Sequence, residues 1–349
     1  MTGRPPIWLL ALVGAAIPLY TLIAISATPG SLQDGSIPEP VVIAFGGDVS
    51  FEGVVEEAFE SDPAGFLSPL EPLLSSADLA VVNLHTAITT GGVAEPKTAT
   101  YRAPPAVLDA LAASGVDVVS LANDHALDYG AAGLSDTLAA IAERDLAAVG
   151  LGENRAEALA PFTVAIRGVS IAIFGATQVL DEDTIDTWAA TDDQPGVAWA
   201  RAGERQRLES AVANTADSFD VIVVYLHWGQ PGANCPFDGQ MATAEGLIAA
   251  GADIVVGTHT QSVQADGTSG RSVVHFGMGN LVADATEAPA TESGILRLTI
   301  YPDSDLLDHE WLPATLVDGI ATPYEPDAEE AARLDTVTAE RRECAGLEP

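Results

Sequence analysis

Five apolar runs of β type in this sequence each end in a side chain that can bind a metal ion or move a proton. The runs are VVIAFGGD, ADLAVVNLH, VDVVSLANDH, DVIVVYLHWG and ADIVVGTHTQ, and they end in Asp48, His85, Asp124, His125, His227, His259 and Gln261. In α/β proteins, ligands and catalytic groups collect at the carboxyl ends of strands. A single histidine at such a position is more often a hydrogen-bonded structural residue than a ligand. Four of the six histidines, together with two aspartates, instead predict a metal site.

Helical segments separate these strands along most of the chain. Strands are expected at 41–47, 78–84, 116–122, 220–227 and 252–257, and helices at 50–75, 104–114, 131–144, 201–215 and 238–250. The consecutive segments FTVAIRG and VSIAIFGA are typical of a β-hairpin. The segments after residue 271 are typical of antiparallel strands, and residues 327–342 are expected to form the last helix. Asp128 is expected to cap the amino end of helix 131–144, and orienting the ring of His125, three residues earlier, is the alternative. Mixed strands with helices outside predict a layered α/β sandwich. No Gly-x-Gly-x-x-Gly motif follows the first strand, so no nucleotide cofactor is expected.

The amino-terminal residues predict a membrane anchor and a tether. Residues 7–27 carry no charge and follow Arg4, and at about 1.5 Å per residue they can cross a bilayer core of about 30 Å. We expect a signal anchor at 1–27, which makes this a single-pass protein of the cell membrane with an extracellular C-terminal domain. Cleavage of the signal, which would give a secreted protein, is the alternative. Residues 28–40 form the expected linker, 41–325 the folded domain, and 326–349 a C-terminal helix and tail.

The net charge excludes some classes of binding partner, and the two cysteines bear on whether the domain contains a disulfide. Fourteen basic and 50 acidic residues give a net charge of −36, which argues against nucleic acid and anionic lipid headgroups as partners. Cys235 and Cys344 are the only cysteines, and in an extracellular domain an even pair predicts a disulfide. Such a bridge would hold the C-terminal tail against the domain. Two free, buried thiols are the alternative.

Seven segments follow one another in a recognisable order: GGDVSFEG, VVNLHTAITT, EPKTATYRAPP, LANDHALDYG, LHWGQ, GADIVVGTHTQSVQ and FGMGNL. In this order they resemble the CapA family of bacterial capsule and poly-γ-glutamate biosynthesis proteins, across residues 41–284. The resemblance implies a four-layer αββα sandwich of the calcineurin-like metallophosphatase type, with a membrane tether and an outward-facing domain. It also implies a metal site between the two sheets, where metallophosphatases hold two ions.

The resemblance further implies roles for single residues. Asp48 matches a ligand of the first metal, and Asp124 stands at the place of a ligand of the second. His125 matches the candidate general acid. His227 and His259 match the histidine of the family's His-Trp-Gly motif and the first histidine of its His-x-His pair.

Four positions depart from the family pattern. His85 replaces a glutamate that would bridge the two ions, and Asp124 replaces an asparagine. Gln261 replaces the second histidine of the pair, and Gln230 stands where a glutamate often follows His-Trp-Gly. The first metal position then keeps mainly Asp48. The ligands that remain for the second position are His85, Asp124, His227 and His259. Three imidazoles and one carboxylate suit a single divalent ion such as zinc, with manganese and iron also open. A decayed, metal-free site whose histidines bond one another is the alternative.

Three further residues are expected to contact substrate. Lys97 and Arg102 lie in the EPKTATYR segment, which the resemblance places near the site, and Asn280 ends a strand-like run. A guanidinium and an ammonium group together can hold a phosphate or a carboxylate. The alternative is that these cations form surface ion pairs worth about 0–1 kcal/mol.

Three functions remain open at this point. The resemblance implies a membrane-tethered protein that binds or guides a cell-envelope polymer during capsule or poly-γ-glutamate assembly or export. The second is a metal-dependent phosphoesterase or other hydrolase acting on such a polymer or its precursor, with His125 as general acid. The third is a non-catalytic subunit beside other membrane biosynthesis subunits.

Overall fold

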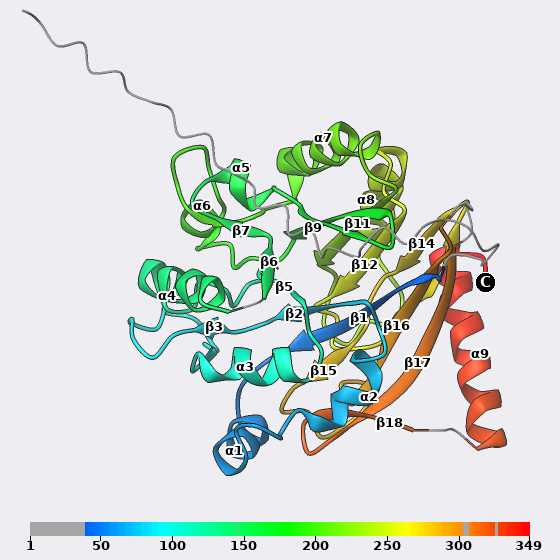
Figure 1. Ribbon diagram of the computed structural model, residues 1–349, viewed down its shortest axis with the longest axis horizontal. Helices are drawn as coiled ribbons and strands as arrows, with labels where there is room; N and C mark the ends of the chain where they lie inside the picture. The colour runs from blue at the N-terminus through cyan, green and yellow to red at the C-terminus, as the bar shows by residue number, and fades with distance from the viewer. Residues whose placement is uncertain (1–38, 145, 303–306, 325–326) are drawn as a thin grey trace, which may run out of the picture.

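The computed structural model describes residues 39–144, 146–302, 307–324 and 327–349. Eight strands form one mixed sheet, with β1 near its centre (Figure 1). In spatial order they are β15 (Asn280–Val282), β18 (Ile320–Pro323), β17 (Leu307–Val317), β16 (Glu292–Ile300), β1 (Val41–Val49), β2 (Leu79–Leu84), β5 (Val118–Ser120) and β6 (Ala147–Val149). β15 also pairs with β1 in parallel, which brings Asn280 beside Asp48.

A second sheet has six strands. Its order is β13 (Asp266–Ser269), β14 (Ser272–His275), β12 (Ile254–Thr258), β11 (Val221–His227), β9 (Val169–Thr177) and β8 (Phe162–Ile166). β8 and β9 form the expected hairpin, because Arg167 and Gly168 both adopt positive φ and so turn the chain tightly. Two short pairs complete the strands: β3 (Ala87–Ile88) with β4 (Arg102–Ala103), and β7 (Leu151–Gly152) with β10 (Gly196–Val197).

Helices cover the outer faces of both sheets. The larger sheet packs against α1 (Val54–Ser61), α2 (Glu71–Leu74), α3 (Ala106–Ala113) and α4 (Gly130–Ala142), and the smaller against α7 (Arg205–Ala216) and α8 (Asp238–Ala249). The remaining helices are α5 (Arg155–Ala158), α6 (Ile185–Trp188) and α9 (Ala328–Ala345), with 3-10 turns at Ser68–Leu70 and Ala202–Glu204. A third hydrophobic cluster lies between the sheets. The layers therefore run helix, sheet, sheet, helix, as predicted.

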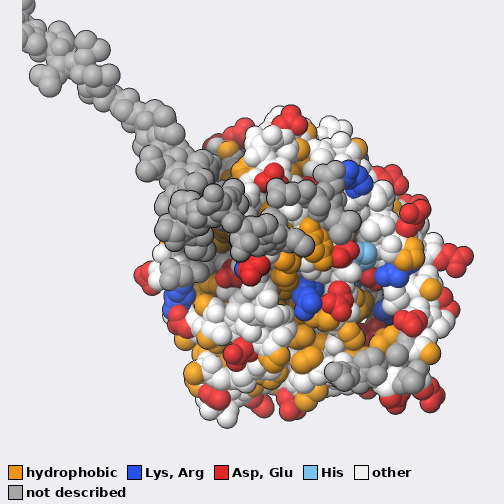
Figure 2. All heavy atoms as spheres, turned by 45° about the vertical axis from the view of Figure 1, so that its right-hand side comes forward, with side chains coloured by type: hydrophobic (Ala, Val, Ile, Leu, Met, Phe, Trp, Pro, Cys, Tyr) orange, Lys and Arg blue, Asp and Glu red, His pale blue; other side chains and the backbone are white. Residues whose placement is uncertain are grey.

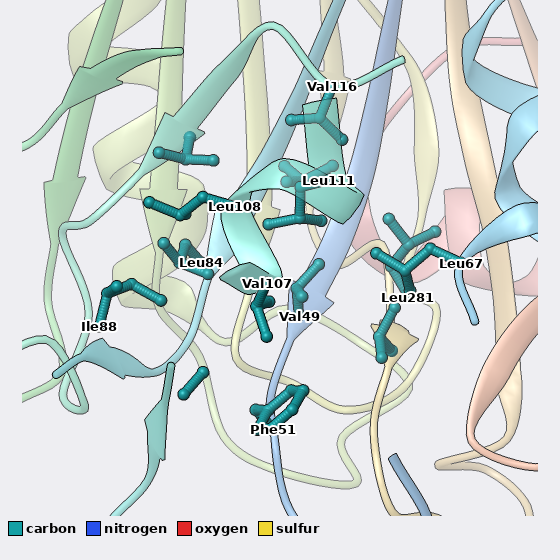
Figure 3. Packing of buried hydrophobic residues seen from close by; sticks show 14 of the residues in the cluster. Val49, Phe51, Leu67, Leu84, Ile88, Val107, Leu108, Leu111, Val116 and Leu281 are labelled. Carbon is teal, nitrogen blue, oxygen red and sulfur yellow. The ribbon is translucent and has the colours of Figure 1, made fainter. Parts of the chain in front are cut away.

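Alternation along the strands builds these layers. In β1, Ile43 and Phe45 point into the core between the sheets, whereas Ala44 joins the cluster under the helices. Val49 joins that cluster too, because the register of β1 shifts between Phe45 and Val49. Figure 3 shows the cluster between the larger sheet and its helices, in which Leu108 and Leu111 of α3 lie against Val49 and Leu84 of the strands. Strands buried on both faces are typical of sheets covered by helices on one side and a second sheet on the other.

Two helix predictions were wrong in detail. The segment 50–75 is not one helix but α1, a 3-10 turn and α2, because prolines at 63, 69 and 72 remove backbone donors and break the ladder. Asp128 does not cap α4, whose N-cap residue is Tyr129 with no side-chain cap. The Asp128 carboxylate is used elsewhere, as described below.

The chain ends in a strap fastened at two points. A disulfide joins Cys344, in the last turn of α9, to Cys235, which precedes α8. Beyond the helix, Glu348 exchanges backbone hydrogen bonds with Thr268 of β13. α9 runs beside β17 in Figure 1 and contacts β13.

The expected membrane anchor cannot be compared with the structure. Residues 7–27 and most of the linker lie outside the described residues. Within the described ranges, no helix combines the length and the apolar character that crossing a bilayer requires.

Candidate metal centre

The carboxyl ends of strands from both sheets meet at one cavity of about 290 Å³. Asp48 is the next-to-last residue of β1, and His85 directly follows β2. Asp124 and His125 follow β5. His227 is the last residue of β11 in the other sheet, and His259 follows β12. His85, Asp124, His125 and His259 line the cavity wall together with Tyr101 and Asn280. The structure thus brings together the histidines and aspartates that the sequence singled out.

Asp124 is the centre of this group. Its Oδ1 atom lies 2.9 Å from Nε2 of His227 and 3.1 Å from Nε2 of His85. Its second oxygen lies 3.8 Å from Nε2 of His125. One partly exposed carboxylate therefore meets imidazole nitrogens from three different strand ends.

The donor set fits a divalent ion. Two ligand atoms at about 2.05 Å from a common ion lie about 2.9 Å apart at a right angle and about 3.3 Å apart at the tetrahedral angle. The two short imidazole–carboxylate distances correspond to the lower end of that range. Two overlapping sets of three donors have all their ligand atoms within 4.8 Å of one another: His85, Asp124 and His125, and Asp124, His227 and His259. The four ligands expected from the sequence are therefore divided between two sets that share Asp124.

Asp48 belongs to neither set, because other groups occupy its carboxylate. Oδ1 accepts a hydrogen bond of 2.6 Å from the side chain of Asn83, and Oδ2 accepts one of 3.0 Å from the backbone N–H of His259. Asn83 in turn accepts a hydrogen bond from Asn123. This buried chain ties β1 and β2 to the loop after β12. In the described structure, Asp48 holds the two sheets in register at the site.

Burial and mutual contacts set the ionisation of this group. Burial opposes the charged form of Asp48 and Asp124, but His227 and His85 together outweigh it and hold the pKa of both carboxyls below the usual range. Burial also opposes the charge on His227, but the two nearby carboxylates prevail and raise its pKa to about 9. Burial and the His227 charge lower the pKa of His259 to about 3, against the weaker opposing effect of Asp124 and Asp48. The pKa of His125 is also lowered, first by burial and then by His85.

His125 is held from behind by a buried ion pair. Its Nδ1 atom lies 2.6 Å from Oδ2 of Asp128, and the ring of Tyr101 stacks on it with centroids 4.1 Å apart. Oδ1 of Asp128 accepts a hydrogen bond of 2.8 Å from the ammonium group of Lys97. Lys97 also donates to the backbone carbonyl of Asp124. The second ring nitrogen of His125 is thereby left to face Asp124 and the cavity.

The two cations expected to bind substrate do not line the cavity. Lys97 is buried, with its ammonium group between Asp128 and the ring of Trp188, 4.7 Å from the centroid. Arg102 is exposed, and its guanidinium lies 5.1 Å from the centroid of the Tyr129 ring. Asn280 does line the cavity, and its side chain donates to the carbonyl of Ala290.

Two acidic residues of the cavity were missed in the sequence. Glu52 and Asp284 line it, and Oε2 of Glu52 is buried without a hydrogen-bond partner among the described residues. Burial raises the pKa of Glu52. A carboxylate four residues after Asp48 is a signal that could have pointed to Glu52, whereas nothing in the sequence places Asp284 here. No lysine or arginine lines the cavity among the described residues, so its charged groups are acids and histidines.

The loop after β12 also adopts an uncommon backbone conformation. His259 has φ of 81° and Gln261 has φ of 52°, a region that costs most non-glycine residues energy. Residues held in this way concentrate at functional sites. Gln261 lines the cavity from this loop, where the family pattern has a histidine.

The sequence that builds this fold and this site matches a family of capsule synthesis proteins. The chain matches the family of bacterial capsule synthesis protein PGA_cap over residues 42–285, and it belongs to this family. The family membership predicted from the motifs is thus confirmed. All the site residues discussed above fall within the matched range.

Two relatives illustrate the relationship. The chain is 32% identical over 185 residues to the capsule biosynthesis protein CapA of Bacillus anthracis, covering 53% of this chain and 44% of that protein. It is 28% identical over 258 residues to the PGA biosynthesis protein CapA of Bacillus subtilis (strain 168), covering 73% and 66% respectively. The matches therefore span less than two thirds of either relative.

Solved structures overlap more weakly. A hypothetical protein from Thermus thermophilus has a TM-score of 0.48 at 15% identity, covering 78% of this chain and 99% of that one. A 5′-nucleotidase from Candida albicans SC5314 has a TM-score of 0.39 at 10% identity, covering 89% and 59%. TM-scores this low say nothing about the chemistry of this chain.

Proposed function

We propose that this protein is a membrane-tethered, extracellular accessory protein of capsule or poly-γ-glutamate assembly, with one divalent ion bound at Asp124. Family membership supports the process, since both named relatives are capsule or PGA biosynthesis proteins. The observation that carries the ion is the approach of His85 and His227 to the same oxygen of Asp124. Because both nitrogens meet one oxygen, we place one ion there rather than two.

The charge of the cavity suggests how the ion would serve a polymer. Glu52, Asp124 and Asp284 would repel a carboxylate-bearing chain, and neither Lys97 nor Arg102 faces the cavity to offset them. A bound divalent ion would supply the missing positive charge. A neutral or cationic glycan fits the same cavity without it. The dependence of polymer binding on the ion therefore separates the two kinds of polymer.

A retention assay with the full chain in liposomes tests this proposal. Poly-γ-glutamate of defined length is sedimented with the vesicles in the presence of Zn²⁺, Mn²⁺ or Fe²⁺, or of a chelator. We expect retention of the polymer to require an ion and to fall in His227→Ala. Retention should survive in His125→Ala, because His125 is not expected to supply the positive charge that holds the polymer. Retention that is unchanged by the chelator and by His227→Ala would contradict the proposal.

The same vesicles test the tether. In right-side-out vesicles, added protease should digest the domain at 41–349, and in inverted vesicles it should leave the domain intact. The opposite pattern would reject the extracellular location.

A metal-dependent phosphoesterase is the second candidate, and one observation favours it. Asp128 and Tyr101 fix the His125 ring so that Nε2 faces Asp124. A divalent ion in such a site acts as a Lewis acid and lowers the pKa of water. In its doubly protonated form, which the Asp128 carboxylate at Nδ1 favours against burial, His125 would hold a proton at Nε2 and give it to a leaving oxygen. Turnover of bis(p-nitrophenyl) phosphate that disappears in His125→Ala supports this function, and turnover that persists in that variant rules it out.

A further inference from the structure

A second cavity among the described residues lies away from the histidines. It measures about 640 Å³ and is bounded by β16, β17 and α9. Figure 2 turns this side of the molecule forward, and a few basic side chains and a histidine lie near one another there among many acidic ones. A volume of this size is in the range that holds a small molecule, about 300–1,000 Å³. The disulfide at Cys344 and the bridge at Glu348 fix the end of α9 beside the cavity.

Arginines are concentrated at this cavity. The whole chain has only 14 basic residues against 50 acidic ones, yet Arg333, Arg341 and Arg342 all line it. Arg342 donates to the carboxylate and the backbone carbonyl of Asp266, at 2.8 and 2.7 Å. The facing wall is largely apolar and aromatic, with Trp311, Pro313 and Ala314.

Arg341 is incompletely paired. One terminal nitrogen donates to Glu292 at 2.8 Å, whereas Nε is buried and has no hydrogen-bond partner among the described residues. The side chain is only 12% exposed. A buried donor left without a partner costs about 1–3 kcal/mol. Glu292 is about one third exposed, so its carboxylate can turn toward solvent.

We propose that this cavity, named here the α9 cavity, is a second binding site that takes a carboxylate-bearing ligand with a short aliphatic body. The ligand carboxylate replaces Glu292 on Arg341 and also reaches Nε, giving the two-pronged pairing that guanidinium and carboxylate favour. A phosphate dianion is less suited, because Asp266, Glu292 and Asp335 surround the arginines. The apolar wall at Trp311 and Pro313 accommodates methylene groups.

This site does not depend on the metal centre. Ala288, Glu292 and Ser293 line the α9 cavity, whereas Asn280 and Ala290 line the histidine cavity, so one chain segment separates the two. A ligand at Arg341 therefore needs none of the imidazoles, and the His227→Ala variant should bind it normally.

Calorimetric titration of the full chain in detergent tests the proposal with two probes. Glutarate carries two carboxylates on a three-methylene body, and glutaramide has the same shape without charge. We expect saturable glutarate binding with a dissociation constant on the order of 1 mM and no binding of glutaramide. Absence of saturable glutarate binding, or equal binding of both probes, would overturn the proposal.

Two substitutions sharpen the test in opposite directions. Glu292→Gln removes the competing carboxylate and should tighten glutarate binding several-fold, a gain that misfolding cannot produce. Arg341→Gln should weaken it by about tenfold or more, whereas Arg144→Gln, which removes a surface arginine paired with Asp109, should have no effect. Unchanged affinity in both Glu292→Gln and Arg341→Gln would place the ligand elsewhere.

Discussion

The cavity lined by His85, His125 and His259, called the histidine cavity, differs from the α9 cavity in how completely its buried polar groups are hydrogen-bonded. Around the histidines, Asp48, Asn83, Asp128 and His227 all have hydrogen-bond or ion-pair partners within the described structure, and one oxygen of Glu52, Oε2, is the exception on the cavity wall. Beside the α9 cavity, His275 has no partner for either ring nitrogen and Arg341 has none for Nε among the described residues.

The difference is that the polar groups of the histidine cavity are already held in place by hydrogen bonds, whereas those of the α9 cavity lower the stability of the fold. A fully bonded polar network fixes the positions of its members and is expensive to break. Unpartnered buried groups cost stability unless a ligand pairs with them. The histidine cavity therefore resembles a preorganised ligand site. The α9 cavity resembles a site where a bound ligand would increase the stability of the protein.

The strongest way to break the first network is to remove the Lys97 charge. In Lys97→Met, Asp128 keeps a buried carboxylate without its cation, and such a change costs about 3–5 kcal/mol. Arg102→Met is the matched control, since its guanidinium is exposed and should change unfolding by less than about 1 kcal/mol. Urea unfolding at pH 7.5 measures both. Similar losses of unfolding free energy in the two variants would show that Lys97 stabilises the fold no more than a surface cation does.

Removing the disulfide tests how firmly α9 closes the second region. The bond spans 109 residues, and loss of a native disulfide commonly costs about 2–4 kcal/mol. We expect the Cys235→Ser, Cys344→Ser double variant to unfold earlier in urea and to show faster amide exchange in α9 than in α7. Unchanged amide exchange in α9 would mean that the contacts of Arg342 and Glu348 hold this helix in place without the disulfide.

His275 should make stability fall in mild acid. It is fully buried beside Trp311, and burial lowers its pKa to about 4, with Asp266, His309, Arg341 and Arg342 as the charged groups around it. The unfolded chain takes up this proton near pH 6.5 and the folded chain does not, so the contribution is complete above pH 6.5. It is lost progressively as the pH falls toward 4, by up to about 3 kcal/mol in total.

A His275→Leu variant isolates that contribution, because the carboxyl groups titrate in both proteins. Unfolding free energies at pH 7.5 and pH 5 should differ by about 2 kcal/mol more in the wild type than in the variant. An equal pH dependence in the two proteins would show that His275 does not resist protonation.

Local pattern predicted the layers and the strand ends of this molecule, but not the pairing of side chains across them. Alternating apolar residues located β1, β2 and β11, and the residue after each strand located most of the histidine cavity. Asp128 and Lys97 were expected at a helix cap and at the substrate, and the structure pairs them with each other. Their pairing depends on how loop 89–101 packs against the segment after β5, which residue spacing does not encode. Glu52 and Asp284 are 232 residues apart in sequence, and they share the cavity because β1 and β15, which precede them, pair in the sheet.

The α9 cavity was not predicted at all. His275 and Arg341 are separated by 66 residues and belong to elements whose packing the sequence does not reveal.

Metal content per chain tests the central claim most directly. The purified full chain, loaded with Zn²⁺, Mn²⁺ or Fe²⁺ and freed of excess, should carry about one equivalent of one of these ions, and His227→Ala should carry none, since that change removes a nitrogen 2.9 Å from Asp124. Gln261→His, which restores a histidine beside the same cavity, should admit a second equivalent. A wild-type protein that binds no ion under any of these conditions, or that binds two, would contradict a single ion held at Asp124.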